Sequence, residues 1–408
     1  MLNPDLIDVI SRLASLERPP ASDGERAAAV LLAEELARRG VRTRIEAERV
    51  HGTYWVPIGM CSLVAALAGV AGRRAAALVG VMSALSIADD LDIGHRPLRR
   101  VLKQRTAHNV LAEVPAQGPG DRTLVIHAHH DAARTGIVFH PRIAKVSARV
   151  AGGLIERVGA TPAPMWGAVH GPAAVCAGGV FGFRPLRHLG TVLSAGFAAA
   201  MANIAFSPAV PAANDNLSGV CVLLALAEAL SRPPPRRLRV LLLSTGSEES
   251  FLEAMVRFGE RYFGNLPQKE TTFLCLESVG SPQLMLLAGE GLLRLRRYPG
   301  RLIETLTELA GEAGVHLREP FRYRMATDGQ VPLLAGYPVA VLSSMDWYKA
   351  PSNYHWPTDR PENLDTDSVA AALTLAEAFV RKLDRDAAGS PDSAQDPGES
   401  VAPASPRR

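Results

Sequence analysis

The stretch RLRVLLLSTGSEES, residues 237–250, decides the fold class of this chain. It begins with an almost continuously apolar run, typical of a strand buried on both faces of a sheet, and it ends in adjacent acidic residues. The stretches TLVIHAHHD (residues 123–131) and TTFLCLES (residues 271–278) have the same form. Because parallel strands share one carboxyl edge, where open α/β sheets bind ligands, we expect the polar residues of the three stretches to meet there.

The remaining sequence alternates between helical and strand patterns. Helical patterns cover residues 3–17, 23–40, 216–230, 301–313 and 367–383, and strand patterns cover residues 42–50, 108–114, 283–289 and 337–344. We therefore predict an α/β fold with a mixed, mostly parallel central sheet flanked by helices, in one domain spanning residues 1–384. The tail, residues 385–408, is rich in Ser, Pro, Asp and Gly and is expected to be disordered.

Two hydrophobic segments interrupt this domain, at residues 54–88 and 161–213. Each is expected to form a helical hairpin whose uncharged arms return to the same side. The arms have about 14 to 25 residues, around the length of about 20 that spans a bilayer. Trp55 and Trp166 lie near the outer ends of arms, where interfacial aromatic residues are favoured. We expect these hairpins to insert into a membrane, the alternative being Ala- and Gly-rich hairpins buried on the domain or in a dimer.

Charge and cysteine usage limit which cellular compartment and which partners we expect for this chain. Basic residues that flank the arms on the catalytic side outnumber those expected in the turns (Arg73, Arg74, Arg184 and Arg187), so the positive-inside rule predicts a cytoplasmic catalytic domain. The amphipathic first residues do not resemble a cleavable signal peptide. All four cysteines lie in apolar runs without CxxC spacing, which favours buried thiols in a reducing compartment. A net charge of +3 without a basic, aromatic-interleaved block argues against nucleic acid as a partner.

Five residues of metal-binding type stand in short polar stretches at strand ends or in loops: His129, Asp215, Glu249, Glu277 and His355. Imidazole and carboxylate together suit zinc, and a carboxylate can bridge two ions. Two zinc ions about 3.5–4 Å apart form a hydrolytic site for acyl and phosphoryl substrates. Each motif alone is weak, since a pair of glutamates is more often a solvated helix start. Their common position on one sheet is what indicates an enzyme.

These five motifs, in this order, resemble the co-catalytic zinc exopeptidase family that includes bacterial leucyl aminopeptidases, glutamate carboxypeptidase II and glutaminyl cyclase. The resemblance covers roughly residues 1–50, 106–135 and 212–384. It implies an aminopeptidase-like fold, a peptide substrate and two zinc ions. One ion would be bound by His129 and Glu277 and the other by Glu249 and His355, with Asp215 bridging them.

The resemblance also implies roles for two residues that are not ligands. Glu248 would be the general base that takes a proton from the bridging water, and Asp131 would orient the site as a supporting carboxylate. Asp328, Asp359 and Asp365 match polar positions of the family. His127 and His130, which flank the first ligand, are interpreted as strand residues or as residues that support the ligands.

Three departures from the family pattern bear on the activity. The first histidine and the bridging aspartate are separated by 85 residues, the fourth ligand is Glu277 where Asp is commoner, and Gly329 stands where a histidine is common. The sequence therefore predicts a membrane-associated di-zinc exopeptidase, with an aminopeptidase favoured. The alternatives are a carboxypeptidase or dipeptidase, an activity like that of glutaminyl cyclase, and a non-catalytic membrane protein that retains the fold. Oligomeric state and side-chain preference are not predicted.

Overall fold

A nine-stranded mixed sheet forms the centre of the protein. The computed structural model describes residues 3–114, 116–118 and 122–388. The strands run in the order β1-β2-β4-β3-β5-β9-β6-β7, with β8 paired to β6. Their bounds are β1 Arg42–Val50, β2 Arg105–Val114, β3 Arg122–His129, β4 Leu238–Thr245, β5 Thr271–Glu277, β6 Gln283–Glu290, β7 Arg296–Arg297, β8 Arg318–Tyr323 and β9 Val339–Met345.

The four central strands, β4, β3, β5 and β9, are parallel, whereas β1, β2 and β7 join through antiparallel pairings. Along β4, Val240 and Leu242 pack into the core on one face, and Leu241 and Leu243 pack into the core on the other. The continuous apolar run of this strand is explained by this burial on both faces. The predicted fold class, a mixed α/β sheet flanked by helices, is confirmed.

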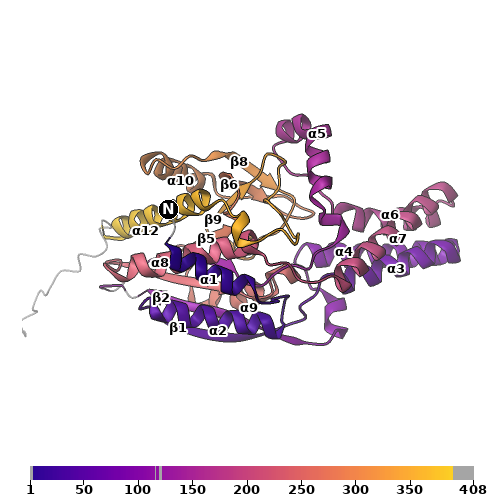
Figure 1. The fold of residues 1–408 in the computed structure, drawn as a ribbon. Coiled ribbons are helices and arrows are strands. Elements are labelled where there is room, and N and C mark those ends of the chain that lie inside the picture. Colours follow the sequence, from indigo (N-terminus) through magenta and orange to yellow (C-terminus); the bar gives the residue numbers. More distant parts are fainter. Residues whose placement is uncertain (1–2, 115, 119–121, 389–408) are drawn as a thin grey trace, which may run out of the picture.

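Helices cover both faces of the sheet (Figure 1). Helices α1, α2, α8, α10 and α12 contribute to the core on one face, and α9 and α11 contribute to the core on the other. The helix bounds are α1 Pro4–Ala14, α2 Asp23–Arg38, α3 Trp55–Ala71, α4 Arg73–Leu91, α5 Pro141–Val158, α6 Trp166–Val180, α7 Arg184–Phe206, α8 Ser218–Ser231, α9 Glu253–Tyr262, α10 Gly300–Glu312, α11 Gln330–Leu334 and α12 Thr366–Ala388.

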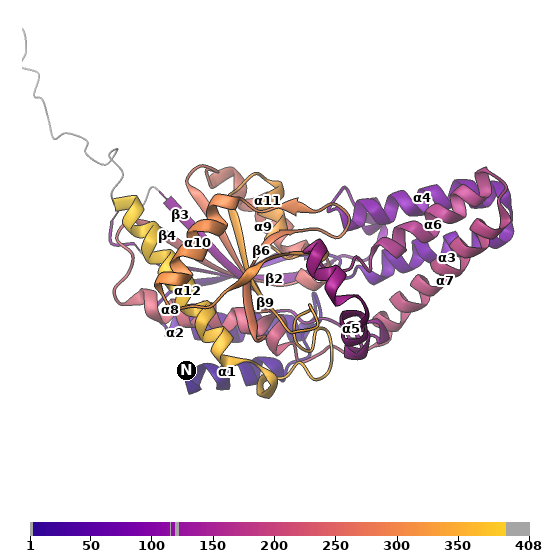
Figure 2. The same ribbon diagram turned by 90° about the horizontal axis from the view of Figure 1, so that it is seen from above.

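The two hydrophobic segments form one four-helix bundle that projects from the sheet domain (Figures 1 and 2). Hairpin α3–α4 packs along hairpin α6–α7, with α4 beside α6 and α3 beside α7. Glycines allow the close approach: a Cβ on Gly80 of α4 would lie 2.6 Å from the backbone nitrogen of Cys176, and one on Gly190 of α7 would lie 2.5 Å from that of Val175. The packing of the two hairpins against each other was not predicted.

Within the part of the chain that the structure describes, two helical segments are long and apolar enough to cross a membrane, α7 and residues Ala213–Ser231. The second is 89% buried inside the domain, as a core helix is, whereas α7 is only 22% buried. Helix α3 is apolar but shorter. Among the described helices that lie outside the core, α7 is therefore the one long and apolar enough to cross a membrane.

Some expected boundaries were wrong. Residues 184–188 were predicted as the turn of the second hairpin, but they begin α7, because Pro185 suits the first turn of a helix. Helix α12 continues to Ala388, so the first residues of the predicted tail are helical. The rest of that tail, residues 389–408, lies outside the described residues. Helix α5 was not predicted.

Candidate metal centre

Three neighbouring parallel strands bring polar residues to the same edge of the sheet. Strand β3 ends at His129, β5 ends at Glu277, and β4 is followed by the short turn η4 (Glu248–Ser250), which begins with Glu248 and Glu249. All four side chains are buried. The convergence follows from the parallel register, since the strands end side by side.

Asp215 lies at the centre of the cluster and faces both histidines. It belongs to the irregular turn η3 (Ala213–Leu217) that precedes α8. Its Oδ1 lies 3.2 Å from His129 Nε2, and its Oδ2 lies 3.2 Å from Nε2 of His355, in the loop after β9. His129 Nε2 is also 3.8 Å from Glu277 Oε1, and His355 Nε2 is 3.2 Å from Glu249 Oε1. The five predicted ligands thus form two groups that share one carboxylate.

This donor set fits two metal ions. In the groups His129–Asp215–Glu277 and Asp215–Glu249–His355, candidate ligand atoms lie within 4.8 Å of one another. Imidazole nitrogens and carboxylate oxygens are the donors that zinc prefers. Oε1 of Glu249 is buried and makes no well-formed hydrogen bond within the described part of the chain, although His355 Nε2 lies 3.2 Å from it. Such a concentration of buried carboxylates is costly unless cations neutralise it, which supports metal binding at both groups.

Asp131 ties the ligands to the loop that carries the two glutamates. Its carboxylate oxygens accept hydrogen bonds from the backbone nitrogens of Glu248 and Glu249, each at 3.1 Å. His129 Nδ1, on the ring edge opposite to Asp215, lies 3.3 Å from the backbone carbonyl oxygen of Asp131 and 3.4 Å from one of these carboxylate oxygens. These contacts favour the orientation in which Nε2 of the imidazole points into the cluster.

Asp359 holds the bridging residue in a similar way. Its carboxylate accepts hydrogen bonds from the backbone nitrogens of Asn214, at 2.7 Å, and Asp215, at 3.1 Å. Ser278 Oγ donates to Glu277 Oε1 at 3.1 Å. Backbone and hydroxyl donors therefore hold the carboxylates of Asp215 and Glu277 in position independently of a bound ion.

Burial dominates the electrostatics of the cluster. It raises the pKa of Glu277 to about 7 and that of Glu248 well above its usual range. Burial alone would lower the pKa of His129, but the charge of Glu248 and hydrogen bonds to the neighbouring carboxylates raise it well above normal. Burial and the nearby carboxylates Asp215 and Glu249 also raise the pKa of the Tyr354 phenol. The raised pKa values of the Glu248 and Glu277 carboxyl groups mean that their ionised forms are costly at this buried site unless a cation compensates them.

The two flanking histidines lie apart from the cluster. His127 is buried, with its ring 6.1 Å from that of Phe273, and burial lowers its pKa to about 3. The pKa of His130 is also lowered to about 3 by burial, and its Nδ1 lies 3.0 Å from Ser244 Oγ. Among the described residues, neither histidine belongs to a candidate metal group.

Two residues at the site were missed from the sequence. Arg18 is fully buried and donates to the backbone carbonyls of Leu13 at 2.9 Å, His130 at 2.5 Å and Pro211, so it connects α1 to the segments that carry two ligands. Tyr354 stacks on the imidazole of His355 with ring centroids 3.8 Å apart. No pattern marks a lone arginine, whereas a tyrosine adjacent to a predicted ligand was a readable signal.

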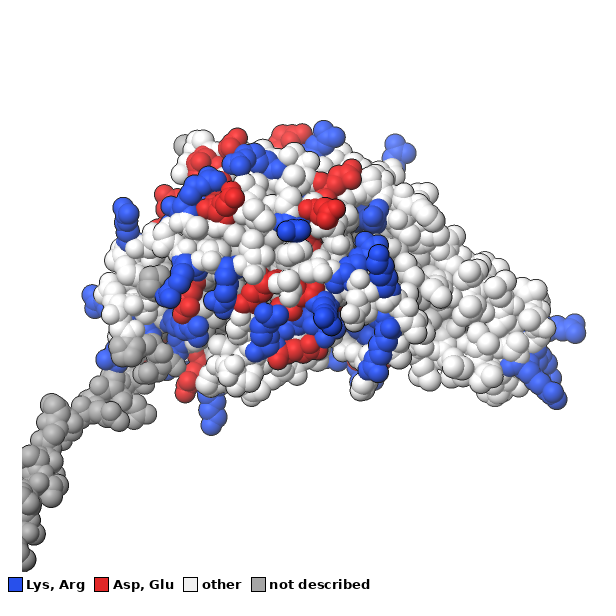
Figure 3. Space-filling view, turned by 90° about the horizontal axis from the view of Figure 1, so that it is seen from below, with Lys and Arg blue, Asp and Glu red and all other residues white. Residues whose placement is uncertain are grey.

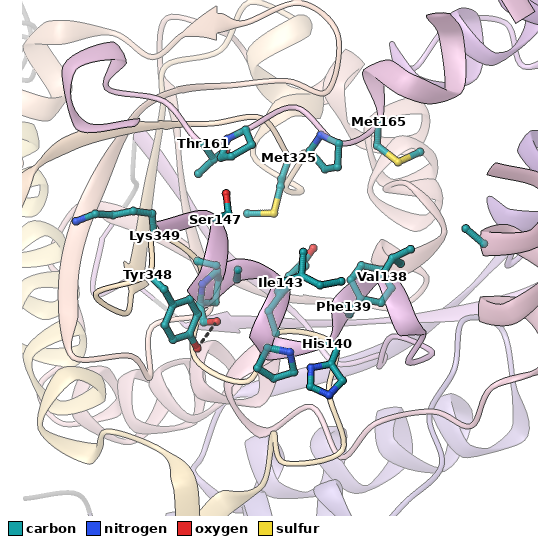
Figure 4. A pocket seen from close by; sticks show the side chains of 18 of the residues that line it. Val138, Phe139, His140, Ile143, Ser147, Thr161, Met165, Met325, Tyr348 and Lys349 are labelled. Carbon is teal, nitrogen blue, oxygen red and sulfur yellow. Dashed lines mark hydrogen bonds between the residues drawn. The ribbon is translucent and has the colours of Figure 1, made fainter. Parts of the chain in front are cut away.

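A second cavity, of about 340 Å³, opens beside the metal cluster (Figure 4). It is largely apolar and lies between α5, the foot of α7 and the loop after β9. Its wall includes Phe139, Ile143, Ala144, Met165, Phe197 and Met201. Met325, Pro351 and Tyr354 line both this cavity and the metal site, so the two are adjacent.

Comparisons with known proteins agree with this fold. Residues 194–380 match peptidase family M28. No match is found among curated proteins. Similar solved structures include a zinc aminopeptidase from Bacillus subtilis (13% identity, TM-score 0.54, covering 93% of this chain and 94% of that one). They also include an aminopeptidase from Aneurinibacillus sp. strain AM-1, with 13% identity and a TM-score of 0.54, covering 93% of each chain. A glutaminyl cyclase from Bacteroides thetaiotaomicron has 12% identity and a TM-score of 0.55, covering 93% of this chain and 98% of that one.

The fold is similar to that of zinc aminopeptidases, and the site has the donor set that zinc prefers. The match to peptidase family M28 covers residues 194–380, and the predicted resemblance to the zinc exopeptidases is confirmed. The comparisons do not single out the leucyl aminopeptidase or the glutamate carboxypeptidase type.

Proposed function

We propose that this protein is a membrane-anchored di-zinc exopeptidase, with an aminopeptidase as the favoured activity. One observation carries the proposal: the two oxygens of Asp215 face two different imidazoles, each accompanied by a further carboxylate. A site for a single zinc ion would need only one of these groups. Since both are complete, a di-metal hydrolase is favoured over a single-zinc cyclotransferase like glutaminyl cyclase.

The chain's residues divide the work between binding and proton transfer. His129 and Glu277 would hold one ion, Glu249 and His355 the other, and Asp215 both. When bound, two zinc ions lower the pKa of a bound water and polarise the scissile carbonyl. Because Tyr354 stacks on His355 and closes one side of the site, it would limit access of bulk water to the reacting bond.

Glu248 is the proposed general base. Its backbone nitrogen is fixed by Asp131, and its Oε2 reaches to 3.9 Å from His129 Nε2, so the carboxylate points at the cluster without completing either bridged group. Burial raises its pKa, which improves its ability to accept a proton from water near neutral pH. The same carboxyl would then return the proton to the leaving amine.

The cavity beside the metal site supports a substrate with a bulky apolar residue next to the scissile bond. A cavity of about 150 Å³ already holds benzene, and this one has about 340 Å³. Apolar side chains such as Ile143 and Phe197 would bind a leucine or phenylalanine side chain by the hydrophobic effect.

The bundle supports membrane anchoring because its large apolar side chains lie on the outside, whereas a soluble bundle buries them between its helices. Its helix contacts use glycine, while large apolar side chains face outward. Among the most exposed on the bundle helices are Met60, Leu63, Leu67, Val70, Leu78, Met82, Leu85 and Val192. On the face seen in Figure 3, the bundle shows no charged side chains until basic side chains appear at its far end. Lipid-facing bundles have this distribution, since tails solvate large apolar groups and small residues permit close packing.

A substrate panel tests the activity. Purified protein loaded with zinc should release the terminal residue from leucine and phenylalanine amides and from dipeptides. Glu248→Gln should retain zinc and fold but lose about 10²–10⁴-fold in turnover. Turnover of N-blocked peptides alone would favour a carboxypeptidase, and cyclisation of amino-terminal glutamine without hydrolysis would favour the cyclase. Wild-type turnover by Glu248→Gln would exclude this residue as the base.

Fractionation tests the anchor. The full-length protein should sediment with membranes, resist extraction by high salt or carbonate, and be released by detergent. Recovery in the soluble fraction after a high-speed spin would contradict membrane insertion of the bundle. The proposed cytoplasmic position of the catalytic domain predicts that a protease added to sealed right-side-out vesicles leaves that domain intact.

A further inference from the structure

Helix α5 carries an apolar stripe that nothing in the described structure covers. Ile143, Val146, Val150, Leu154 and Val158 recur at helical spacing and are all exposed, Val150 to 83%. The helix is attached to the domain through a different face, on which Ile155 is buried. An apolar stripe of this length on a solvated helix implies a partner surface.

Basic residues flank the stripe. Arg142, Lys145, Arg149 and Arg157 belong to α5, and its single acidic residue, Glu156, is already paired with Arg318 at 2.6 Å. Lys145 and Arg149 lie over the rings of Tyr348 and Trp347, at 5.6 and 6.0 Å, and remain exposed. The helix therefore offers an apolar face bordered by positive charge, the pattern of helices that lie in the interface of anionic membranes.

The position of α5 agrees with such a surface. In both views the helix lies at the foot of the bundle, beside the sheet domain, and runs crosswise to the bundle helices (Figures 1 and 2). If the bundle spans a bilayer, a helix crosswise to it at its foot lies along the plane of the membrane surface. Trp347, whose ring lies 6.0 Å from the Arg149 guanidinium of α5, is exposed, and so is Trp166 at the start of α6. Tryptophan is favoured at membrane interfaces.

We propose that α5 is an interfacial helix that binds the surface of an anionic phospholipid bilayer through this stripe and its basic border. This inference rests on the proposed membrane anchoring by the bundle. It has a consequence for the active site, because Ile143, Ala144 and Ser147 of α5 also line the apolar cavity next to the metal centre. The mouth of that cavity would then open at the level of the lipid head groups, where an apolar peptide partitioned into the membrane can reach it.

Lipid quenching tests the proposal without using activity. The full-length chain, with its four native cysteines replaced by alanine, is labelled with an environment-sensitive fluorophore at a single introduced cysteine and placed in lipid nanodiscs. The labelled sites are Val150→Cys on α5, Leu67→Cys on the bundle and Glu308→Cys on α10 as the control on the sheet domain. Retained zinc binding shows that each variant is folded. The quencher is a lipid with a spin label near its head group.

We expect the fluorophores at residues 150 and 67 to be quenched and that at residue 308 to be unaffected. Quenching at residue 67 but not at 150 would overturn the role of α5 while leaving the anchor intact. A fluorophore at residue 150 that lipid does not quench, yet that soluble iodide cannot reach, would show that a protein or a second copy covers the stripe, and would also overturn it. No quenching at residue 67 would refute the anchor, and the inference with it.

Lipid composition tests the charge. Quenching at residue 150 should be stronger in discs that contain phosphatidylglycerol than in discs of phosphatidylcholine alone. Replacing Arg142, Lys145 and Arg149 by glutamine should remove most of that difference, with a change of about fivefold per charge in the docking equilibrium. A difference that survives in this triple variant would exclude the basic border as the cause.

Discussion

Replacement of Asp131 by asparagine tests how the site is held. The carboxylate accepts two backbone hydrogen bonds, from Glu248 and Glu249, and contacts His129 Nδ1. Asparagine has the same shape but one acceptor oxygen, so its amide nitrogen would face either a backbone N–H or the imidazole. A hydrogen bond to a charged group contributes about 1.5–3 kcal/mol, and about 1.4 kcal/mol corresponds to a tenfold change in an equilibrium.

We therefore expect Asp131→Asn to weaken zinc binding by about 10- to 100-fold, which is also the usual range for residues that support metal ligands. The assay is zinc competition with a chelator of known affinity, and circular dichroism confirms the fold. Asp365→Asn is the matched control, because Asp365 caps α12 by accepting from the Ser368 nitrogen, a role that asparagine fulfils equally well. Unchanged zinc affinity in Asp131→Asn would refute the supporting role of this carboxylate.

Three further predictions follow from the site and its surroundings. His355→Ala should remove about one zinc ion per chain, whereas His130→Ala should leave the zinc content unchanged; equal loss in both would mean that the ligands were identified wrongly. Ala144→Trp should fill the cavity and lower kcat/KM about 10- to 100-fold for leucine and phenylalanine substrates but not for alanine substrates. Val146→Trp, on the exposed face of the same helix, is the control. Parallel losses for all substrates would refute the cavity as the side-chain site. Burial raises the pKa of Glu290 to about 8, above its value in the unfolded chain, so its contribution to stability is complete at acidic pH and is lost as pH rises from about 4.5 to 8. Thermal unfolding should therefore show wild type losing stability relative to Glu290→Gln over that range, and parallel curves would contradict the shift.

The sequence contained most of the fold because the central strands are buried on both faces. Residues 240–243 are four consecutive apolar residues that are all buried, a pattern with no polar face of the kind that a surface helix or a surface strand turns towards water. Three of the predicted metal ligands, His129, Glu249 and Glu277, could be identified for the same reason: each ends or follows such a run, and a parallel sheet brings strand ends together. His355 and Asp215 lie in loops, and only the resemblance to a family assigned them.

Features that depend on contacts distant in the sequence were not predictable. The two hairpins pack along each other through glycines such as Gly80 and Gly190, and the hydrophobic periodicity of the sequence does not indicate this contact. Arg18 reaches the site across 112 residues of sequence, to the carbonyl of His130. Helix α5 is different, since the spacing of Ile143, Val146 and Val150 is itself a readable helical pattern.

The metal content of the purified protein tests the central claim most directly. We expect elemental analysis to find two zinc ions per chain in the wild type, and almost none in Asp215→Ala, because that carboxylate faces both imidazoles at 3.2 Å. A wild type that binds a single ion, or an Asp215→Ala variant that keeps both, would contradict a di-zinc site bridged by this residue.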